Sequence, residues 1–214
     1  LVRDVVSWTV LMAGYVQCQN GEEALKCFER MKYEGLSPDA ITFISLLQAC
    51  SSIGAMNTGI QIHDEIMRRG LLREDIMLGT ALVDMYGRCC SFAKAQEIFD
   101  SIAIRDVVLW TALMTGHVEC GKDEAALDCI EKMQQEGISP NAFTFVCGLK
   151  ACCSIGCGEK LKTVHAEVIK KGFEDDMVIG GTLVDAYAKC CLITTAAEVF
   201  DRLVIRSEVA WTAL

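Results

Sequence analysis

Hydrophobic and polar residues along the chain recur with the 3.6-residue period of an α-helix. Between Gly21 and Gly35 one stripe is apolar, and the other positions carry mainly Glu, Lys and Arg. The apolar stripe consists of Ala24, Leu25, Phe28 and Met31. Residues 6–16 also combine apolar and small residues at helical spacing, and Gly35 and Pro38 mark the end of the second helix. The pattern therefore predicts a hairpin of two helices.

The same helix-turn-helix pattern continues through the rest of the chain. It covers residues 41–69, 77–100, 108–136, 143–171 and 178–203, and no segment shows a convincing strand pattern. One such hairpin cannot bury its apolar stripe alone, so neighbouring hairpins must stack on each other. We therefore predict an all-α fold, a right-handed α-solenoid of antiparallel helix-turn-helix repeats.

Two long copies of this pattern are visible in the sequence. The segment DVVSWTVLMAGYV at Asp4 returns as DVVLWTALMTGHV at Asp106, which is 102 positions later. The same spacing relates Trp8 to Trp110, Pro38 to Pro140 and His63 to His165. The spacing falls to 101 between LVDMYGRCC and LVDAYAKCC, which predicts one residue fewer in the loop after Gly172. Each long copy contains three hairpins, so the structural unit is the shorter hairpin.

Composition and charge narrow the class of protein. Apolar residues make up 52% of the 214 residues and charged residues 23%, which excludes a disordered chain. No apolar run is long enough for a membrane span. Twenty basic and twenty-nine acidic residues give a net charge of −9, which argues against binding nucleic acid chiefly through phosphates. The chain starts at Leu1 and stops within a repeat at Leu214, so we expect both ends to be cuts in a longer protein.

The side chains that could carry chemistry form no recognisable constellation. The thirteen cysteines are odd in number and have neither a disulfide-framework pattern nor CxxC spacing, which predicts mainly buried free thiols. There is no repeated Ser/His/Asp or Cys/His arrangement and no phosphate-binding glycine loop. The sequence thus predicts no enzyme, no catalytic residue, no metal and no cofactor. Packing roles are predicted for His63, His165, Trp8, Trp110 and Trp211.

At the motifs quoted above the chain resembles the pentatricopeptide repeat (PPR) family, and in particular the plant organellar subclass that cycles P, L and S motifs (PLS). The resemblance places a P motif at 5–39, L at 40–75, S at 76–106, P at 107–141, L at 142–176, S at 177–207 and the start of a P at 208–214, with the tail of a preceding repeat at 1–4. One departure recurs: Cys90 and Cys191 stand where the family usually has glycine, which we expect to alter the turn there.

The resemblance implies that each motif faces one base of single-stranded RNA and recognises it through its fifth and last residues. The implied pairs are Thr9 with Asp39, Thr80 with Asp106 and Thr111 with Asn141. Weak recognition is implied for Ile44 with Asp75 and Val146 with Asp176, and Gly181 with Ser207 is assigned no base. By the family's rule Thr with Asp favours guanine and Thr with Asn favours adenine, so the implied target is G-N-G-A-N-N.

Other contacts follow from the same resemblance. The second residue of each motif is expected to sandwich the base, although a core role is an equal alternative from the sequence; these residues are Val6, Ile41, Met77, Val108, Phe143 and Val178. Arg88 and Lys189 are candidate phosphate contacts, with solvated charges as the alternative. The first helices, expected to line the inner face, carry three charges of each sign, namely Asp84, Arg88, Glu119, Lys150, Asp185 and Lys189.

The resemblance therefore implies an RNA-binding specificity module of a mitochondrial or chloroplast RNA-processing factor, most often in C-to-U editing. Its implied partners are single-stranded RNA and editing-complex proteins, with neither a membrane nor a small-molecule substrate. A deaminase-like domain would lie beyond this chain. The alternatives are a protein-interaction scaffold of the tetratricopeptide type and a factor for organellar RNA stabilisation or splicing.

Overall fold

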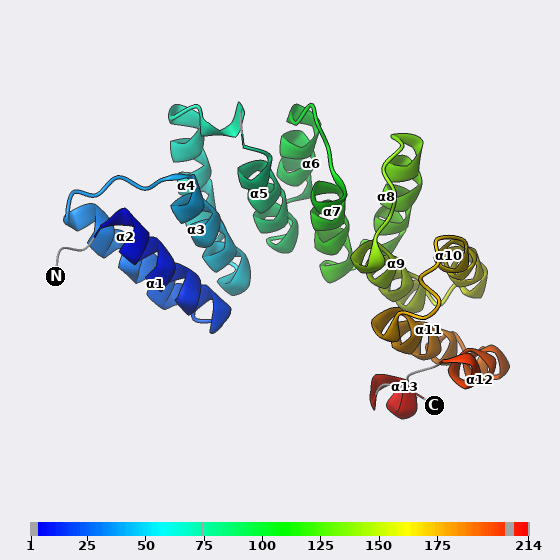
Figure 1. Cartoon of the computed structure of the whole chain (residues 1–214). Coiled ribbons are helices and arrows are strands. Elements are labelled where there is room, and N and C mark those ends of the chain that lie inside the picture. Colours follow the sequence, from blue (N-terminus) through cyan, green and yellow to red (C-terminus); the bar gives the residue numbers. More distant parts are fainter. Residues whose placement is uncertain (1–3, 74, 204–207, 214) are drawn as a thin grey trace. The chain divides into compact units, whose positions relative to one another are not determined.

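The computed structural model describes residues 4–73, 75–203 and 208–213 (Figure 1). These residues form α-helices, one short 3₁₀ helix and no strand, which confirms the predicted all-α class. The elements are α1 (Val5–Gln17), α2 (Gly21–Tyr33), α3 (Ala40–Ile53), α4 (Met56–Arg68), η1 (Leu71–Arg73), α5 (Ile76–Arg88), α6 (Phe92–Ser101), α7 (Val107–Glu119), α8 (Asp123–Gln135), α9 (Ala142–Ile155), α10 (Gly158–Lys170), α11 (Met177–Lys189), α12 (Ile193–Arg202) and α13 (Glu208–Ala213).

The chain divides into two compact units, Leu1–Gly116 and His117–Leu214, with the boundary inside α7. In the first unit α1 packs on α2 and α3, and α5 packs on α3 and α6. In the second unit α9 packs on α8, α10 and α11, and α11 packs on α12 and α13. Within each unit the first helix of one hairpin thus lies against the first helix of the next. This is the stacking of a helical solenoid.

Six complete motifs are expected from the sequence, and we call their residue ranges intervals: 5–39, 40–75, 76–106, 107–141, 142–176 and 177–207. Each interval begins at the first residue of a helix. These helices are α1, α3, α5, α7, α9 and α11, and we call them the first helices; their hairpin partners α2, α4, α6, α8, α10 and α12 are the second helices. First helices are apolar along most of their length, and α3, for example, packs on α1, α2, α4 and α5. Second helices carry one apolar stripe, as Ala24, Phe28 and Met31 of α2 show by their burial.

Aromatic side chains fill the junctions between hairpins. Trp8 and Trp110 are each 3% exposed, and the Trp110 ring meets the edge of Phe99 with 4.5 Å between the ring centroids. The predicted core role is confirmed for these two residues. It is wrong for Trp211, which is 61% exposed and contacts Phe200 at 4.7 Å, because in the described residues no further helix covers α13.

The histidines of the two long copies pack against tyrosines. His63 Nδ1 lies 2.8 Å from the Tyr86 hydroxyl, and His165 Nδ1 lies 2.9 Å from the Tyr187 hydroxyl. Each pair links a second helix to the next first helix and buries the tyrosine almost completely. The packing role predicted for both histidines is therefore confirmed. The tyrosine partners were present in the repeated LVDMYG and LVDAYA segments.

The cysteines are only partly the buried thiols that the sequence predicts. Eleven of the thirteen are free thiols. Cys27, Cys50, Cys129 and Cys152 are buried, whereas Cys18 and Cys191 are exposed. Burial raises the pKa of Cys50, Cys129 and Cys152 to about 12, which keeps these thiols protonated and unreactive at neutral pH.

The turns between helices keep a left-handed residue even where the sequence lacks glycine. Cys90 and Cys191 have φ of 56° and 59°, so the expectation of an altered turn is wrong: the cysteines adopt the conformation that glycine would take. Gln19, at φ 57°, does the same in the first copy, while Gly121 takes the matching place in the second at φ 70°. A side chain in this region is strained by contact with its own backbone.

Relief of this strain gives a stability prediction. We expect Cys191→Gly to raise the free energy of unfolding by about 1 kcal/mol, because glycine has no Cβ to clash at positive φ. Urea denaturation followed by circular dichroism measures this. Cys18→Gly is the matched control: Cys18 is also exposed but has φ −82°, so the same replacement there should lower stability. An equal effect at both cysteines would contradict the assignment of strain.

The buried histidines give a pH prediction. Burial lowers the pKa of His63 and of His165 below the ordinary value. Below about pH 6.5 the unfolded chain therefore binds more protons than the folded chain, so stability should fall as the pH drops from about 7 to about 5. Urea midpoints at the two pH values measure the loss. The double variant His63→Gln and His165→Gln should lose less, and an unchanged loss would assign it to other groups.

Candidate nucleic-acid interface

In each of the two units, exposed apolar side chains mark the start of the first helices. The second residue of each is between 57% and 74% exposed, with Val108 the least and Phe143 the most exposed. The others are Val6, Ile41, Met77 and Val178. The sequence left a core role open for these six positions, and the exposure excludes it. Single exposed apolar residues are ordinary, but the same exposure at the same position of every first helix indicates that, within each unit, these side chains are available to the apolar face of a partner.

In every interval whose last residue the structure describes, that residue caps the first helix of the following interval. Asp39 Oδ1 accepts hydrogen bonds from the Thr42 amide at 2.8 Å and the Thr42 hydroxyl at 2.7 Å. Asp75 accepts from the amides of Met77 and Leu78, Asp106 from Leu109, Asn141 from Thr144, and Asp176 from Val178 and Ile179. Asp4 caps α1 in the same way. In the described residues no second helix has such a side-chain cap.

Sequence reasoning missed this capping role, although the signal was available. Aspartate and asparagine before a helical pattern are the preferred N-cap residues, because their oxygen satisfies an amide without an intrahelical partner. Each cap contact uses Oδ1, and no hydrogen bond to Asp39 Oδ2 is found among the described residues. The cap therefore fixes the side chain while leaving one polar atom for another partner.

In the first interval the structure brings the two predicted recognition residues together. The Thr9 and Thr42 hydroxyl oxygens lie 2.7 Å apart, and Thr42 in turn contacts Asp39. Thr9 is only 7% exposed, and its hydroxyl also lies 2.8 Å from the Val5 carbonyl. Because each hydroxyl has one proton, Thr9 can donate either to Val5 or to Thr42, but not to both. Asp39 is exposed, so of these two residues it is Asp39 that can contact a ligand directly.

The remaining fifth residues differ in what they can offer. The hydroxyl of Thr80 donates to the carbonyl of Ile76 at 2.8 Å, which leaves its lone pairs as acceptors, and the hydroxyl of Thr111 donates to the carbonyl of Val107 at 2.6 Å. Ile44 and Val146 are half-buried and apolar. Gly181 is buried and has no side chain, and its predicted partner Ser207 lies outside the described residues.

The two candidate phosphate contacts are both in ion pairs. Arg88 Nε lies 2.9 Å from Asp84 Oδ1, and Lys189 Nζ lies 2.8 Å from Asp185 Oδ2, each one helical turn away. The hydrogen bond to Asp185 raises the pKa of Lys189. Asp84 also accepts a hydrogen bond from Ser51 in α3. Arg88 and Lys189 are therefore neutralised by carboxylates on their own helices. This pairing weakens the attraction that either cation can exert on a phosphate.

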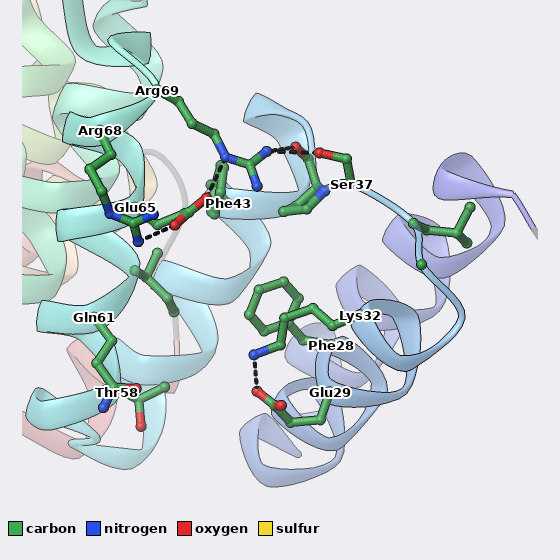
Figure 2. Close-up of a pocket in the computed structure, with 14 residues that line it drawn as sticks. Phe28, Glu29, Lys32, Ser37, Phe43, Thr58, Gln61, Glu65, Arg68 and Arg69 are labelled. Atoms are coloured by element: carbon green, nitrogen blue, oxygen red, sulfur yellow. Dashed lines mark hydrogen bonds and ion pairs between the residues drawn. The ribbon is translucent and has the colours of Figure 1, made fainter.

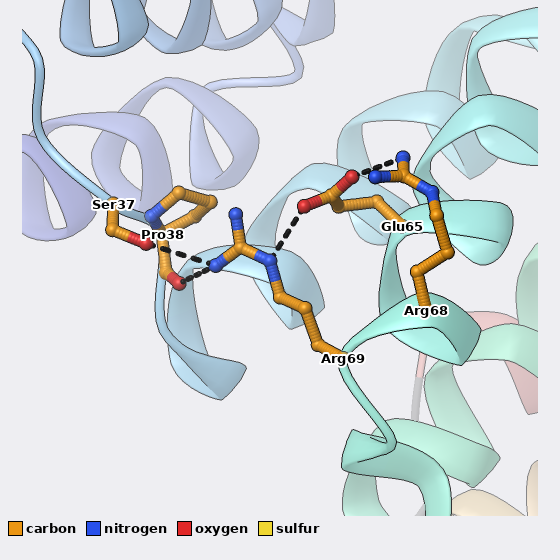
Figure 3. A network of polar contacts seen from close by, with 5 residues as sticks. All are labelled: Ser37, Pro38, Glu65, Arg68 and Arg69. Carbon is orange, nitrogen blue, oxygen red and sulfur yellow. Dashed lines mark hydrogen bonds and ion pairs between the residues drawn. The ribbon is translucent and has the colours of Figure 1, made fainter.

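A clamp holds the linker that leads to Asp39. Figure 3 shows the Arg69 guanidinium between Glu65 and the linker, where Nη1 donates to the Ser37 hydroxyl at 3.0 Å and the Pro38 carbonyl at 2.9 Å. Glu65 also pairs with Arg68, and the hydrogen bond from Arg69 lowers the pKa of Glu65. Because Pro38 directly precedes Asp39, the clamp fixes the backbone that presents the cap.

This clamp borders a groove of about 490 Å³ on the side of the second helices (Figure 2). Phe28 and Phe43 line it beneath Lys32 and Arg69, whose charged groups lie 4.6 and 5.4 Å from the ring centroids. The second copy keeps the clamp in simpler form, since Lys171 Nζ donates to the Ser139 hydroxyl at 2.9 Å, two residues before Asn141. The arrangement is thus a repeated positioning device.

Among the described residues, no group of three or more His, Cys, Asp or Glu side chains could hold a metal ion. In the same part of the chain, no helix combines the length and apolar character needed to cross a membrane.

Comparison with known proteins relates these repeats to a family. The model of the PPR repeat family matches residues 3–52 and 105–154, which include α1 to most of α3 and α7 to most of α9. Three pentatricopeptide repeat-containing proteins of Arabidopsis thaliana are similar over essentially the whole chain. At2g33680 is 38% identical over 99% of the chain, At1g06140, mitochondrial, 34% over 100%, and At4g18520, chloroplastic, 33% over 99%. Residues 3–52 and 105–154 therefore match pentatricopeptide repeats, and the chain as a whole is similar to proteins that contain such repeats.

The chain spans about a third of each relative, namely 29%, 38% and 34% of their lengths. Two solved structures share its fold. The crystal structure of the pentatricopeptide repeat protein PPR10 in complex with an 18-nt psaJ RNA element has a TM-score of 0.55 and 17% identity, covering 100% of this chain and 42% of that one. Nuclear proteinaceous RNase P 2 from A. thaliana has a TM-score of 0.55 and 14% identity, covering 78% and 38%. These likenesses confirm the solenoid fold.

The cap gives a prediction that separates structure from recognition. Asp39→Ala should lower the free energy of unfolding by about 1 kcal/mol, because it removes the acceptor for the Thr42 amide. Asp39→Asn should stay within about 0.5 kcal/mol of the parent chain, since Asn141 caps α9 in the second copy. Urea denaturation measures both. If Asn destabilised as much as Ala, the carboxylate charge rather than the cap would carry the effect.

Proposed function

We propose that the chain binds single-stranded RNA with the face formed by its first helices, one base per repeat. The observation that carries this proposal is that the second residue of each of the six first helices is an exposed apolar residue, two positions after an aspartate or asparagine fixed as an N-cap. An apolar side chain can contact the flat face of a base, and a fixed polar atom can recognise its edge. The RNA bound in the PPR10 crystal structure supports the proposal by analogy of fold.

The target proposed is G-N-G-A-N-N, with its 5′ end toward the N-terminus. Guanine is assigned to the pairs Thr9 with Asp39 and Thr80 with Asp106, and adenine to Thr111 with Asn141. In the first pair Asp39 makes the direct contact, while Thr9 and Thr42 orient its carboxylate through their hydroxyl contacts. Repeats with Ile44 or Val146 at the fifth position act mainly as spacers.

The charge distribution supports binding through bases rather than phosphates. Arg88 and Lys189 are neutralised by Asp84 and Asp185, and the chain as a whole carries −9. Affinity is then modest per repeat and depends less on salt than in a basic protein. The same pairing disfavours a tetratricopeptide-like scaffold, which needs free cations to clamp peptide carboxylates.

For the whole protein, we propose the PLS subclass, an organellar location and a part in C-to-U editing. The P, L and S order of the motifs supports the subclass, and relatives named mitochondrial and chloroplastic support the location. In this proposal a deaminase-like domain outside this chain or a recruited partner carries the chemistry. RNA stabilisation or splicing is the alternative use of the same binding module.

A gel-shift series on RNAs varied at single positions tests the code. We expect replacement of either guanine or of the adenine to weaken binding about tenfold, and replacement at the N positions to change it little. Asn141→Asp, which keeps a capping side chain, should shift that position from adenine toward guanine. The matched control is Asn57→Asp, which lies on the exposed surface of α4. Indifference to all three specified bases would contradict the proposal.

A further inference from the structure

A groove between two first helices of the second unit contains a cation without an ion pair. Its volume is about 410 Å³, and it is lined by α9 and α11. The polar side chains in its lining are Lys150, Ser154, Thr182, Asp185 and Lys189. Lys150 is exposed, and in the part of the chain that the structure describes it is the one cation of the first helices that makes no ion pair.

The charges of this groove do not cancel. Asp185 neutralises Lys189 at 2.8 Å, so the positive charge of Lys150 is left over and the groove carries a net charge of +1. The Thr182 hydroxyl donates to the Val178 carbonyl at 2.7 Å, whereas Ser154 is exposed and can turn its hydroxyl toward a ligand. An ammonium group and a hydroxyl donor that share one groove suit an anion with several acceptor oxygens.

The first copy provides a natural comparison within the chain. Gln48 takes the place of Lys150, and Arg88 with Asp84 takes the place of Lys189 with Asp185. There Ser51 in addition donates to Asp84 at 3.0 Å across the junction of α3 and α5. This counterpart therefore carries no net charge. The two copies differ at this position by one cation.

We propose that the groove between α9 and α11 binds a phosphodiester group of the RNA, with Lys150 as its direct cationic contact and Ser154 as a hydrogen-bond donor. This inference rests on the proposed function and deepens it, because it assigns backbone contact to a residue outside the recognition positions. It also reassigns the role given to Lys189, whose ammonium is held by Asp185 and shapes the groove beside Lys150. An exposed lysine acts here as a mobile point charge.

The test is RNA affinity at several salt concentrations for two opposite variants. We expect Lys150→Gln to weaken binding about three- to fivefold near physiological salt and to reduce the slope of log affinity against log salt by about 0.7, the value for one phosphate on a single strand. Gln48→Lys should increase the slope by a similar amount by adding the missing cation in the first copy. Lys162→Gln is the control, because Lys162 lies in α10 and pairs with Glu159.

The outcomes separate this inference from the proposed function. If the parent chain shows its base preference but Lys150→Gln leaves both slope and affinity unchanged, the groove assignment is overturned alone. If the parent chain binds no RNA, both proposals fail. An additional arm titrates inorganic phosphate by calorimetry. Binding of phosphate that is lost in Lys150→Gln, together with unchanged RNA binding, would identify a site for free phosphate and overturn the assignment to the RNA backbone.

Discussion

The hydrogen bond from a helix N-terminus to the preceding aspartate or asparagine is the constraint on which the candidate interface depends. It sets the residue at which each first helix begins. It thereby places the second residue of that helix on the exposed surface. It also fixes the polar side chain itself beside that exposed residue. In the described residues only first helices have this cap. One local interaction thus aligns the apolar and polar halves of each candidate base contact.

Charge pairing within individual first helices has a separate, electrostatic effect. Asp84 and Asp185 each lie one turn before a cation and hold it along its own helix. Exposed pairs of this kind add little to stability, so their main consequence is electrostatic. They weaken the attraction of the first helices for polyanions, and in the described residues they leave Lys150 as the cation of these helices that makes no ion pair. The acidic net charge of the chain is thus compatible with a selective interface.

Local sequence rules could predict the helices, because period, glycine and capping residues all act within a few positions. The resemblance to the family located the second residues of the motifs, but the sequence could not decide their exposure, which depends on neighbouring hairpins. The burial of Thr9 also depends on Thr42, which is 33 positions later, and the pairing of His63 with Tyr86 spans 23. The base-recognition roles themselves remain predictions. The error at Trp211 has the same origin, since burial there requires a covering helix.

The clamp at Arg69 has a consequence for the exchange of repeats. Arg69 follows α4 in the second interval, yet it holds Ser37 and Pro38 at the end of the first. Lys171 and Ser139 repeat this dependence in the second unit. The segment that can be exchanged as a unit therefore does not end where the sequence motif ends. A repeat moved into another chain keeps the contact that holds its last residues only if the basic residue of the following repeat is moved as well. The segment to exchange in recombination or design therefore includes parts of two motifs.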